Sequence, residues 1–157
     1  MPAMQETREG IARWLAASDQ QLRLDIDRFS CVLSKQHGGV GCAFEFGMSL
    51  HDAGFNPRLL LQLASAGLGR FVGALALNPD DGQCVLVKWV ACNGESAQQD
   101  STDVLSVVEQ LANQAEVWHD MLLSYQSRHR SGRNQSVVPR SPSVLPLSLS
   151  QQLRGFR

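Results

Sequence analysis

The sequence lacks the common signatures of a catalytic site. It contains no phosphate-binding loop, no G-x-S-x-G nucleophile elbow and no H-E-x-x-H pair. The segment Gly67-Leu68-Gly69 has neither the third glycine nor the strand–turn–helix context that a dinucleotide site needs. Asp80 and Asp81 stand in an expected hairpin turn, where aspartate serves the backbone. We therefore predict that the protein is not an enzyme and binds no cofactor.

Cysteine is scarce, and none of the four cysteines forms a C-x-x-C pair, which argues against a redox centre. Cys31, His37 and Cys42 offer three soft ligands, but zinc sites generally use more closely spaced pairs. Strand alternation explains Cys31 and Cys42 better, as small buried residues. We predict no metal site and expect the thiols to stay reduced.

Long apolar runs are also missing. No stretch approaches the roughly 18 apolar residues that a membrane span requires. Residues 1–10 are polar and charged, without the basic segment and apolar core of a signal peptide. We expect a cytoplasmic protein with no membrane span.

Charge is distributed unevenly along the chain. All 15 acidic residues lie in 1–127 with eight basic ones, so this part carries a net charge of −7. Residues 128–157 contain six arginines and no acid. An acidic body repels nucleic acid, and a basic segment rich in Ser and Pro is typical of a disordered arm. We predict one domain over 1–127 and a flexible tail over 128–157.

Apolar residues at helical spacing predict helices over 4–17, 57–66 and 101–127. In the last of these, one apolar stripe recurs every three or four residues, and Asp100 or Ser101 is the expected N-cap. The stripe consists of Val104, Val108, Leu111, Ala115, Trp118, Leu122 and Tyr125.

Alternation of apolar and polar residues predicts strands within 22–50, where a change of phase indicates a bend or bulge near Arg28. The segments 71–77 and 84–90 flank a turn at 78–82 and form a predicted hairpin. The order of helix, strands, helix, hairpin and helix favours an α+β fold, with a mostly antiparallel sheet and helices on one face.

The short helix over 57–66 is apolar on nearly every side, so it must be covered on more than one face. It is therefore either a central core helix or a helix shared between two subunits. The segment Phe44-Glu45-Phe46 leaves two interpretations open as well. Its aromatic rings either form an exposed apolar patch for a protein partner or pack in the core.

Three segments together resemble the class I chaperones of bacterial type III secretion. They are the leucine-rich helix from Pro57 to Ala66, the hairpin from Gly73 to Leu86 with its acidic turn, and the sequence Ala115-Glu116-Val117-Trp118 in the last helix. The resemblance covers about residues 4–127. It implies a twisted antiparallel sheet with three helices and a homodimer built on the second helix. The implied interface residues are Leu59, Leu60, Leu63 and Ala64.

The resemblance also implies the partners. Secreted effector proteins would bind through N-terminal segments that pair with strand edges and place apolar side chains in surface grooves. We assign this contact to Leu24, Val40, Phe44 and Phe46. The chaperone would then deliver its client to the export ATPase, and the same resemblance implies a small regulatory protein as a further partner.

The basic tail exceeds the minimal fold of this family. Arg128, Arg130 and Arg133 are candidates for docking on the ATPase or on the regulatory protein, and a simple solubility arm is the alternative. A competing hypothesis for the whole chain is a nucleic-acid-linked adaptor that acts through this tail. The acidic body, the small number of aromatic residues and the lack of a nucleic-acid-binding motif argue against it.

Overall fold

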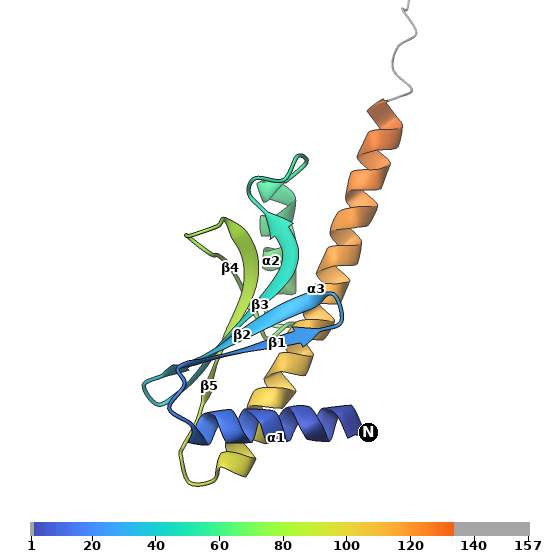
Figure 1. Cartoon of the computed structure of the whole chain (residues 1–157). Coiled ribbons are helices and arrows are strands. Elements are labelled where there is room, and N and C mark those ends of the chain that lie inside the picture. The colour runs from blue at the N-terminus through green and yellow to red at the C-terminus, as the bar shows by residue number, and fades with distance from the viewer. Residues whose placement is uncertain (1, 134–157) are drawn as a thin grey trace, which may run out of the picture. The chain divides into compact units, whose positions relative to one another are not determined.

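The computed structural model describes the backbone of residues 2–133 and the side chains of residues 4–128. Three helices and a five-stranded antiparallel sheet make up this part of the chain (Figure 1), which confirms the predicted α+β class. Residues 1–126 form one compact unit. The elements are α1 (Pro2–Ala16), β1 (Gln21–Ile26), β2 (Phe29–Gln36), β3 (Gly39–Ser49), α2 (Pro57–Gly67), β4 (Ala74–Leu77), β5 (Gln83–Ala91) and α3 (Ala97–Arg133).

The sheet has the strand order β1-β2-β3-β5-β4, so β1 and β4 are its outer strands. The change of phase near Arg28 is a hairpin turn and not the bend or bulge predicted. Ile26 pairs with Phe29, and Asp27 takes a positive φ of 53° between them. Aspartate is one of the few side chains that tolerate this conformation, which explains how two residues suffice for the turn.

Helix α3 is longer at both ends than the sequence pattern predicts. It begins at Ala97, where the Ser96 hydroxyl accepts a hydrogen bond from the Gln99 N–H at 3.4 Å. Asp100 is therefore not the cap. Its carboxylate accepts the Gly94 N–H at 3.2 Å and so holds the preceding loop. The helix continues to Arg133, six residues beyond the predicted end, and residues 134–157 lie outside the described part.

The apolar stripe of α3 packs on one face of the sheet and forms the core. Six of its seven predicted members are buried, and only Tyr125 is partly exposed. Burial of side chains of this size contributes about 1.5–3 kcal/mol each, before the entropy of ordering them is subtracted. The sheet meets the stripe with rows of paired residues, of which one runs through Leu24, Cys31, Phe44, Leu86 and Leu75.

A buried glutamine on α3 determines where β4 begins. Gln114 is almost completely covered, and its side-chain oxygen accepts the Gly73 N–H at 2.9 Å. Its side-chain nitrogen donates to the Gly73 carbonyl at 3.0 Å. The amide thus hydrogen-bonds both the N–H and the C=O of Gly73, which are the groups that a neighbouring strand would otherwise pair with. Gly73 has no room for a Cβ beside Leu111 and Gln114. Strand β4 therefore starts at Ala74, three residues later than predicted.

Besides the outer edge of the short strand β4, two stretches of strand edge have no partner in the described part of the chain. Strand β4 covers only residues 84–87 of β5, so Lys88–Ala91 pair with β3 alone. Strand β1 pairs with β2 alone. The Lys35 N–H donates to the Gln20 carbonyl at 2.9 Å, and hydrogen-bonded pairs alternate along an antiparallel ladder. The backbone groups of β1 that point away from the sheet therefore belong to Gln21, Arg23 and Asp25.

We predict that Gln114→Leu destabilises the protein by about 1–3 kcal/mol, because it leaves the half-buried N–H and C=O of Gly73 without partners. Urea denaturation followed by tryptophan fluorescence measures this change. The matched control is Gln110→Leu on the exposed side of the same helix, which should stay within about 0.5 kcal/mol of the parent. Equal midpoints for both variants would refute the role given to Gln114.

Candidate protein-binding surfaces

The first candidate surface is an apolar hollow between α2 and β4. It encloses about 340 Å³ and is lined almost wholly by apolar and small side chains. Leu61 and Leu68 stand at this hollow with 64 % and 80 % of their surfaces exposed. Single exposed leucines are ordinary on a protein surface, but several around one hollow are typical of a contact with another protein. The α2–β4 hollow is lined by Leu61, Ala64, Gly67, Leu68, Gly69, Phe71, Val72, Gly73, Ala74, Leu75 and Trp118.

Two packed aromatic residues form the floor of the α2–β4 hollow, of which Trp118 is buried and Phe71 is partly exposed. The ring of Phe71 meets Trp118 of α3 edge to face, with centroids 6.2 Å apart. Trp118 also meets Phe46 in the same geometry at 6.3 Å, so the floor continues into the core. Gly67 lets α2 approach both Trp118 and Phe71 closely, since a Cβ there would lie 3.3 and 3.1 Å from their rings. Rings held in this way give the hollow a defined shape.

The structure divides the four predicted interface residues. Leu60 is 4 % exposed and belongs to the protein's own core, so its assignment to a subunit interface is wrong. Leu59 and Leu63 are half-buried and pack against the same core, and Ala64 lines the α2–β4 hollow. The side chains that α2 turns to solvent are thus not those that the sequence singled out. Leu61 is the member of the leucine run that faces outward.

The second candidate surface is the free edge of β1. Leu24 is half-buried in the middle of this strand and packs against the core. The strand alternates between exposed and half-buried residues along its whole length. A free row of backbone donors and acceptors beside half-buried leucines is what an added strand needs. This geometry keeps Leu24 as a candidate contact.

The other three predicted effector contacts are core residues. Val40, Phe44 and Phe46 are at most 1 % exposed, so the interpretation of Phe44-Glu45-Phe46 as an exposed patch is wrong. The alternative left open by the sequence, core packing, is the observed one. Their side chains lie on the side of the sheet that α3 covers, because strand alternation places every second residue of β3 on that face.

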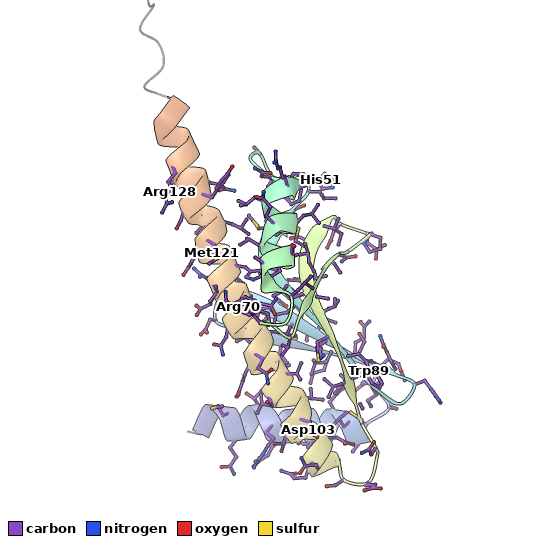
Figure 2. All side chains as sticks on the ribbon, turned by 180° about the vertical axis from the view of Figure 1, so that it is seen from behind. His51, Arg70, Trp89, Asp103, Met121 and Arg128 are labelled. Carbon is purple, nitrogen blue, oxygen red and sulfur yellow. The ribbon has the colours of Figure 1, made fainter. Side chains whose placement is uncertain are left out.

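The opposite face of the sheet is not covered by a helix in the described part of the chain. Trp89 lies on this face with 49 % of its surface exposed (Figure 2). Its indole ring lies over Gly39 of β3, where a Cβ would lie 2.8 Å from the ring and 2.2 Å from the Val90 carbonyl oxygen. Trp14 and Trp118 are buried, so Trp89 is the one tryptophan with a large exposed surface.

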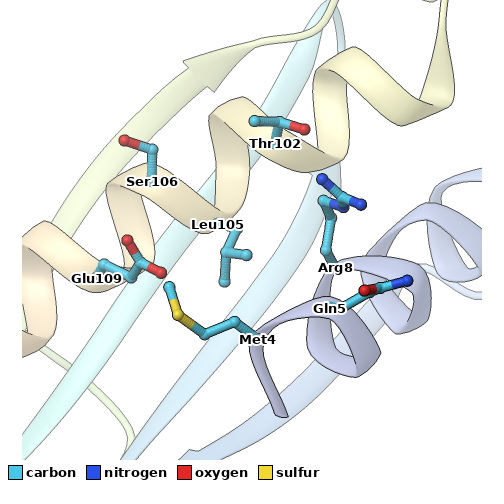
Figure 3. A pocket seen from close by; sticks show the side chains of 7 residues that line it. All are labelled: Met4, Gln5, Arg8, Thr102, Leu105, Ser106 and Glu109. Carbon is cyan, nitrogen blue, oxygen red and sulfur yellow. The ribbon is translucent and has the colours of Figure 1, made fainter. Parts of the chain in front are cut away.

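Another hollow lies between α1 and the first half of α3 (Figure 3). It encloses about 390 Å³, with Met4, Gln5 and Arg8 on one side. Thr102, Leu105, Ser106 and Glu109 line the other side. The Nε of Arg8 is covered and has no hydrogen-bond partner among the described residues. Because a guanidinium and a carboxylate line the same hollow, its charge favours no particular partner.

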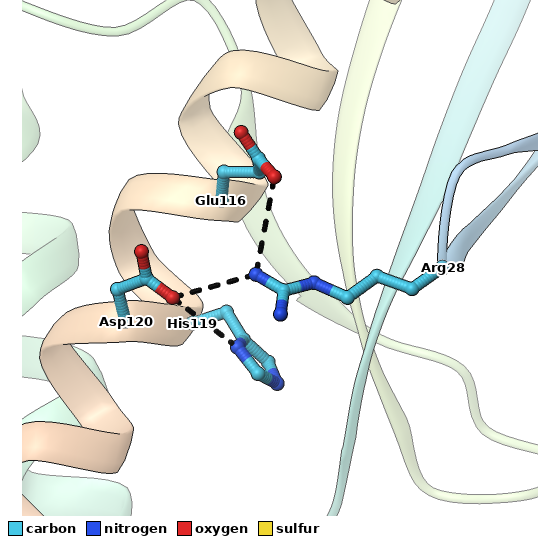
Figure 4. Close-up of polar contacts among 4 residues, drawn as sticks. All are labelled: Arg28, Glu116, His119 and Asp120. Atoms are coloured by element: carbon cyan, nitrogen blue, oxygen red, sulfur yellow. Dashed lines mark hydrogen bonds and ion pairs between the residues drawn. The ribbon is translucent and has the colours of Figure 1, made fainter.

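Ion pairs between Arg28 and two acids of α3 connect the β1–β2 turn to that helix (Figure 4). The Arg28 guanidinium lies 3.4 Å from Asp120 and 3.9 Å from Glu116, and it also covers the ring of Phe29. His119 has its Nδ1 3.8 Å from Asp120 and packs edge-on against Phe29. Exposed pairs of this kind contribute little free energy individually. Their effect is to hold one end of β1 at the helix.

The cysteines have the environment of structural thiols. Burial raises the pKa of both Cys31 and Cys42 to about 12. Burial also raises the pKa values of Cys84 and Cys92 above the ordinary value. All four thiols are free, and raised pKa values keep them protonated and unreactive at neutral pH. Among the described residues no group of three or more His, Cys, Asp and Glu is placed to hold a metal ion.

None of the helices in the described range combines the length and apolar character that a membrane span requires. Arg128 is exposed near the end of α3. Arg130 and Arg133 belong to the helix, but their side chains lie outside the described set. The remaining tail residues, from 134 onward, lie outside the described part of the chain.

Comparison with solved structures identifies the fold. One chain in the structure of the HopA1–SchA chaperone–effector complex matches with a TM-score of 0.52 and 14 % identity, over 74 % of this protein and 92 % of that chain. A chain of the ExoU–SpcU heterodimer, from the type III secretion system of Pseudomonas aeruginosa, matches with a TM-score of 0.51 and 20 % identity. That match covers 72 % of this protein and 94 % of the other chain.

The fold is that of a class I type III secretion chaperone. A scan against known protein families and a search of curated proteins find no match. The resemblance read from three sequence segments is thereby confirmed for the fold, including its three helices and antiparallel sheet.

Sequence reasoning missed three residues that shape these surfaces. Leu61 and Leu68 are seven residues apart and so share one side of the helical path, and this spacing was the available signal that they belong to one surface. Gln114 carried a weaker signal, a polar residue within the apolar stripe of α3. A polar side chain at a core position usually has a specific backbone partner.

Proposed function

We propose that the protein is a cytoplasmic type III secretion chaperone, which binds N-terminal segments of secreted effector proteins and delivers them to the export apparatus. The main support for this proposal is the fold, which the protein shares with chains of two chaperone–effector complexes. The absence of catalytic motifs in the sequence agrees with a role in binding. The length and the basic, proline-containing end resemble those of HpaB, the general export chaperone of plant-pathogenic bacteria. We extend the proposal to a chaperone of that kind, which serves several effectors.

An effector segment would bind in extended form along β1. The outward backbone groups of Gln21, Arg23 and Asp25 supply hydrogen bonds that depend little on the client's sequence. The half-buried Leu24 lies between them and supplies an apolar contact. Backbone pairing of this kind suits a chaperone with several clients, because every extended chain offers the same donors and acceptors.

We also propose that two copies of the chain associate through the α2–β4 hollow. Leu61 and Leu68 would enter the apolar surface of the partner copy, and Ala64 would permit close approach. Exposed leucines around a hollow with an aromatic floor match the usual make-up of an interface centre. This arrangement keeps the second helix at the interface but moves the contact to its outward side.

The basic tail would dock on the export ATPase or on a small regulatory protein. Six arginines without an acid in 128–157 attract an acidic surface, while the acidic body repels it. The adaptor hypothesis uses the same charges for nucleic acid, and salt dependence separates the two.

We predict that Leu61→Asp converts a dimer into a monomer, because it places a charge in the apolar contact. Size exclusion with light scattering gives the mass at micromolar concentration. The matched control is Gln62→Asp, an exposed neighbour on the same helix, which should remain dimeric. Leu60→Asp is unsuitable, since Leu60 is a core residue and its loss would unfold the chain. A parent protein that is monomeric at these concentrations would rule out the proposed dimer.

We predict that Arg23→Pro weakens capture of an effector N-terminal fragment, because proline removes an outward N–H from β1 without breaking a bond to β2. Calorimetric titration of the fragment measures the affinity. Arg23→Gln keeps the N–H and serves as the matched control, so the expected order is parent and Arg23→Gln above Arg23→Pro. Equal affinity for all three would exclude strand addition at this edge.

We predict that replacing Arg128, Arg130 and Arg133 together by glutamine weakens binding to the export ATPase roughly tenfold, while effector capture is unchanged. Biolayer interferometry with the immobilised ATPase measures this. Replacing Arg58 and Arg70, which are exposed elsewhere, is the charge control. Salt-dependent binding of the parent to DNA or RNA, lost in the triple variant, would favour the adaptor hypothesis instead.

A further inference from the structure

A polar hollow lies at the β1–β2–β3 end of the uncovered sheet face. It encloses about 520 Å³, enough for a whole side chain of a partner. Asp25, Ser30 and Glu45 stand in one row across the three strands, since Asp25 pairs with Ser30 and Ser30 pairs with Glu45. Asp81 reaches the same hollow from the β4–β5 turn. We call this the acidic hollow. It is lined by Arg23, Asp25, Asp27, Arg28, Phe29, Ser30, Glu45, Gly47, Asp81 and Gln83.

Negative charge prevails in the acidic hollow. Four of its lining residues are acids and two are arginines. Arg28 is engaged with Glu116 and Asp120 of α3, so it does not neutralise the hollow's own acids. Arg23 is the remaining cation, and it lies 3.5 Å from Glu45 and 3.9 Å from Asp25. The site therefore has acceptor capacity for one more cationic group.

A second observation points to a missing partner. The Ser30 side chain is nine-tenths buried at this hollow, and its hydroxyl has no hydrogen-bond partner in the described part of the chain. A covered hydroxyl without a partner costs free energy, so a ligand that hydrogen-bonds to it gains the corresponding stabilisation. Ser30 lies directly between Asp25 and Glu45 in the row. A donor group that reaches Ser30 is therefore surrounded by carboxylates.

The chemistry of the acidic hollow favours a guanidinium over a metal ion. Its acids are not gathered closely enough to form a metal-binding group among the described residues. A guanidinium presents five donors in a plane and can meet acceptors that are spread around it. Arg23 already pairs with Glu45, which shows that this carboxylate accepts a guanidinium in the observed geometry.

We infer that the acidic hollow binds an arginine side chain of the effector segment that lies along β1. The inference rests on the proposed function for the source of that arginine. The hollow lies beside the free edge of β1, so a segment paired with Arg23 and Asp25 can place a side chain in it. The partner class is thus an extended apolar segment with an arginine near its end. The guanidinium would contact Glu45 and Asp81 and would donate to the Ser30 hydroxyl.

The test uses the full chain and N-acetyl-L-arginine amide as the probe, with N-acetyl-L-citrulline amide as its uncharged match. Nitrogen-15 NMR titration should show saturable shifts at the amides of Ser30 and Glu45 with the arginine probe and none with the citrulline probe. Glu45→Gln and Asp81→Asn should each weaken the response roughly fivefold, the effect of one charge–charge contact at a partly exposed site. Asn at position 81 retains the oxygen that accepts the Gln83 N–H, so this variant keeps its turn.

Glu95→Gln removes an exposed acid that does not line the hollow, and it should bind the probe like the parent. Arg23→Gln should bind the probe more tightly, because it removes the internal competitor for Glu45. Equal responses to both probes, or responses that survive Glu45→Gln and Asp81→Asn, would overturn the inference. Effector capture is measured separately. A protein that captures an effector without any arginine-specific response would refute this site and leave the proposed function intact.

Discussion

The packing of one apolar stripe of α3 on one face of the sheet is the contact on which the other features depend. The stripe runs from Val104 to Leu122 along the face of the sheet that carries the large side chains, and Ile11, Trp14 and Leu60 of the other two helices complete the same core. Among the described residues this leaves the opposite face without a helix and the two outer strands with one neighbouring strand each. The surfaces that a partner could use are thus a consequence of how the core is built, and they require no additional element.

Polar contacts around this core mainly determine where the outer strands of the sheet lie. Gln114 sets the start of β4 at Ala74 by hydrogen-bonding the backbone of Gly73, and Arg28 holds the β1–β2 turn beside α3. Neither contact buries much area, but each decides where an edge of the sheet lies in relation to the helix. The free edge of β1 and the α2–β4 hollow therefore stand on opposite outer strands of one sheet. A client on one and a second copy of the chain on the other would not compete for the same residues.

The sequence predicts the elements well and the surfaces poorly, for a physical reason. Periodicity identifies the apolar side of α3 and the alternation of β3, because both patterns arise from the regular backbone. It cannot tell which apolar residue is covered by its own chain and which by a partner, since both are equally apolar. Phe44 and Leu60 were expected at contacts with partners and are core residues, while Leu61 is exposed. Only the packing of the folded chain separates these cases.

The short reach of β4 has a consequence for the behaviour of the protein at high concentration. On the side away from β3, residues 88–91 of β5 have no strand partner among the described residues, and Trp89 adds an exposed aromatic ring beside this edge. An edge of this kind is a template on which further copies can stack into sheet aggregates. The exposed Lys88 at its beginning adds a charge to this edge, and charged side chains on an edge strand disfavour the stacking of further copies. We expect a lysine at this place to oppose polymerisation of the folded protein.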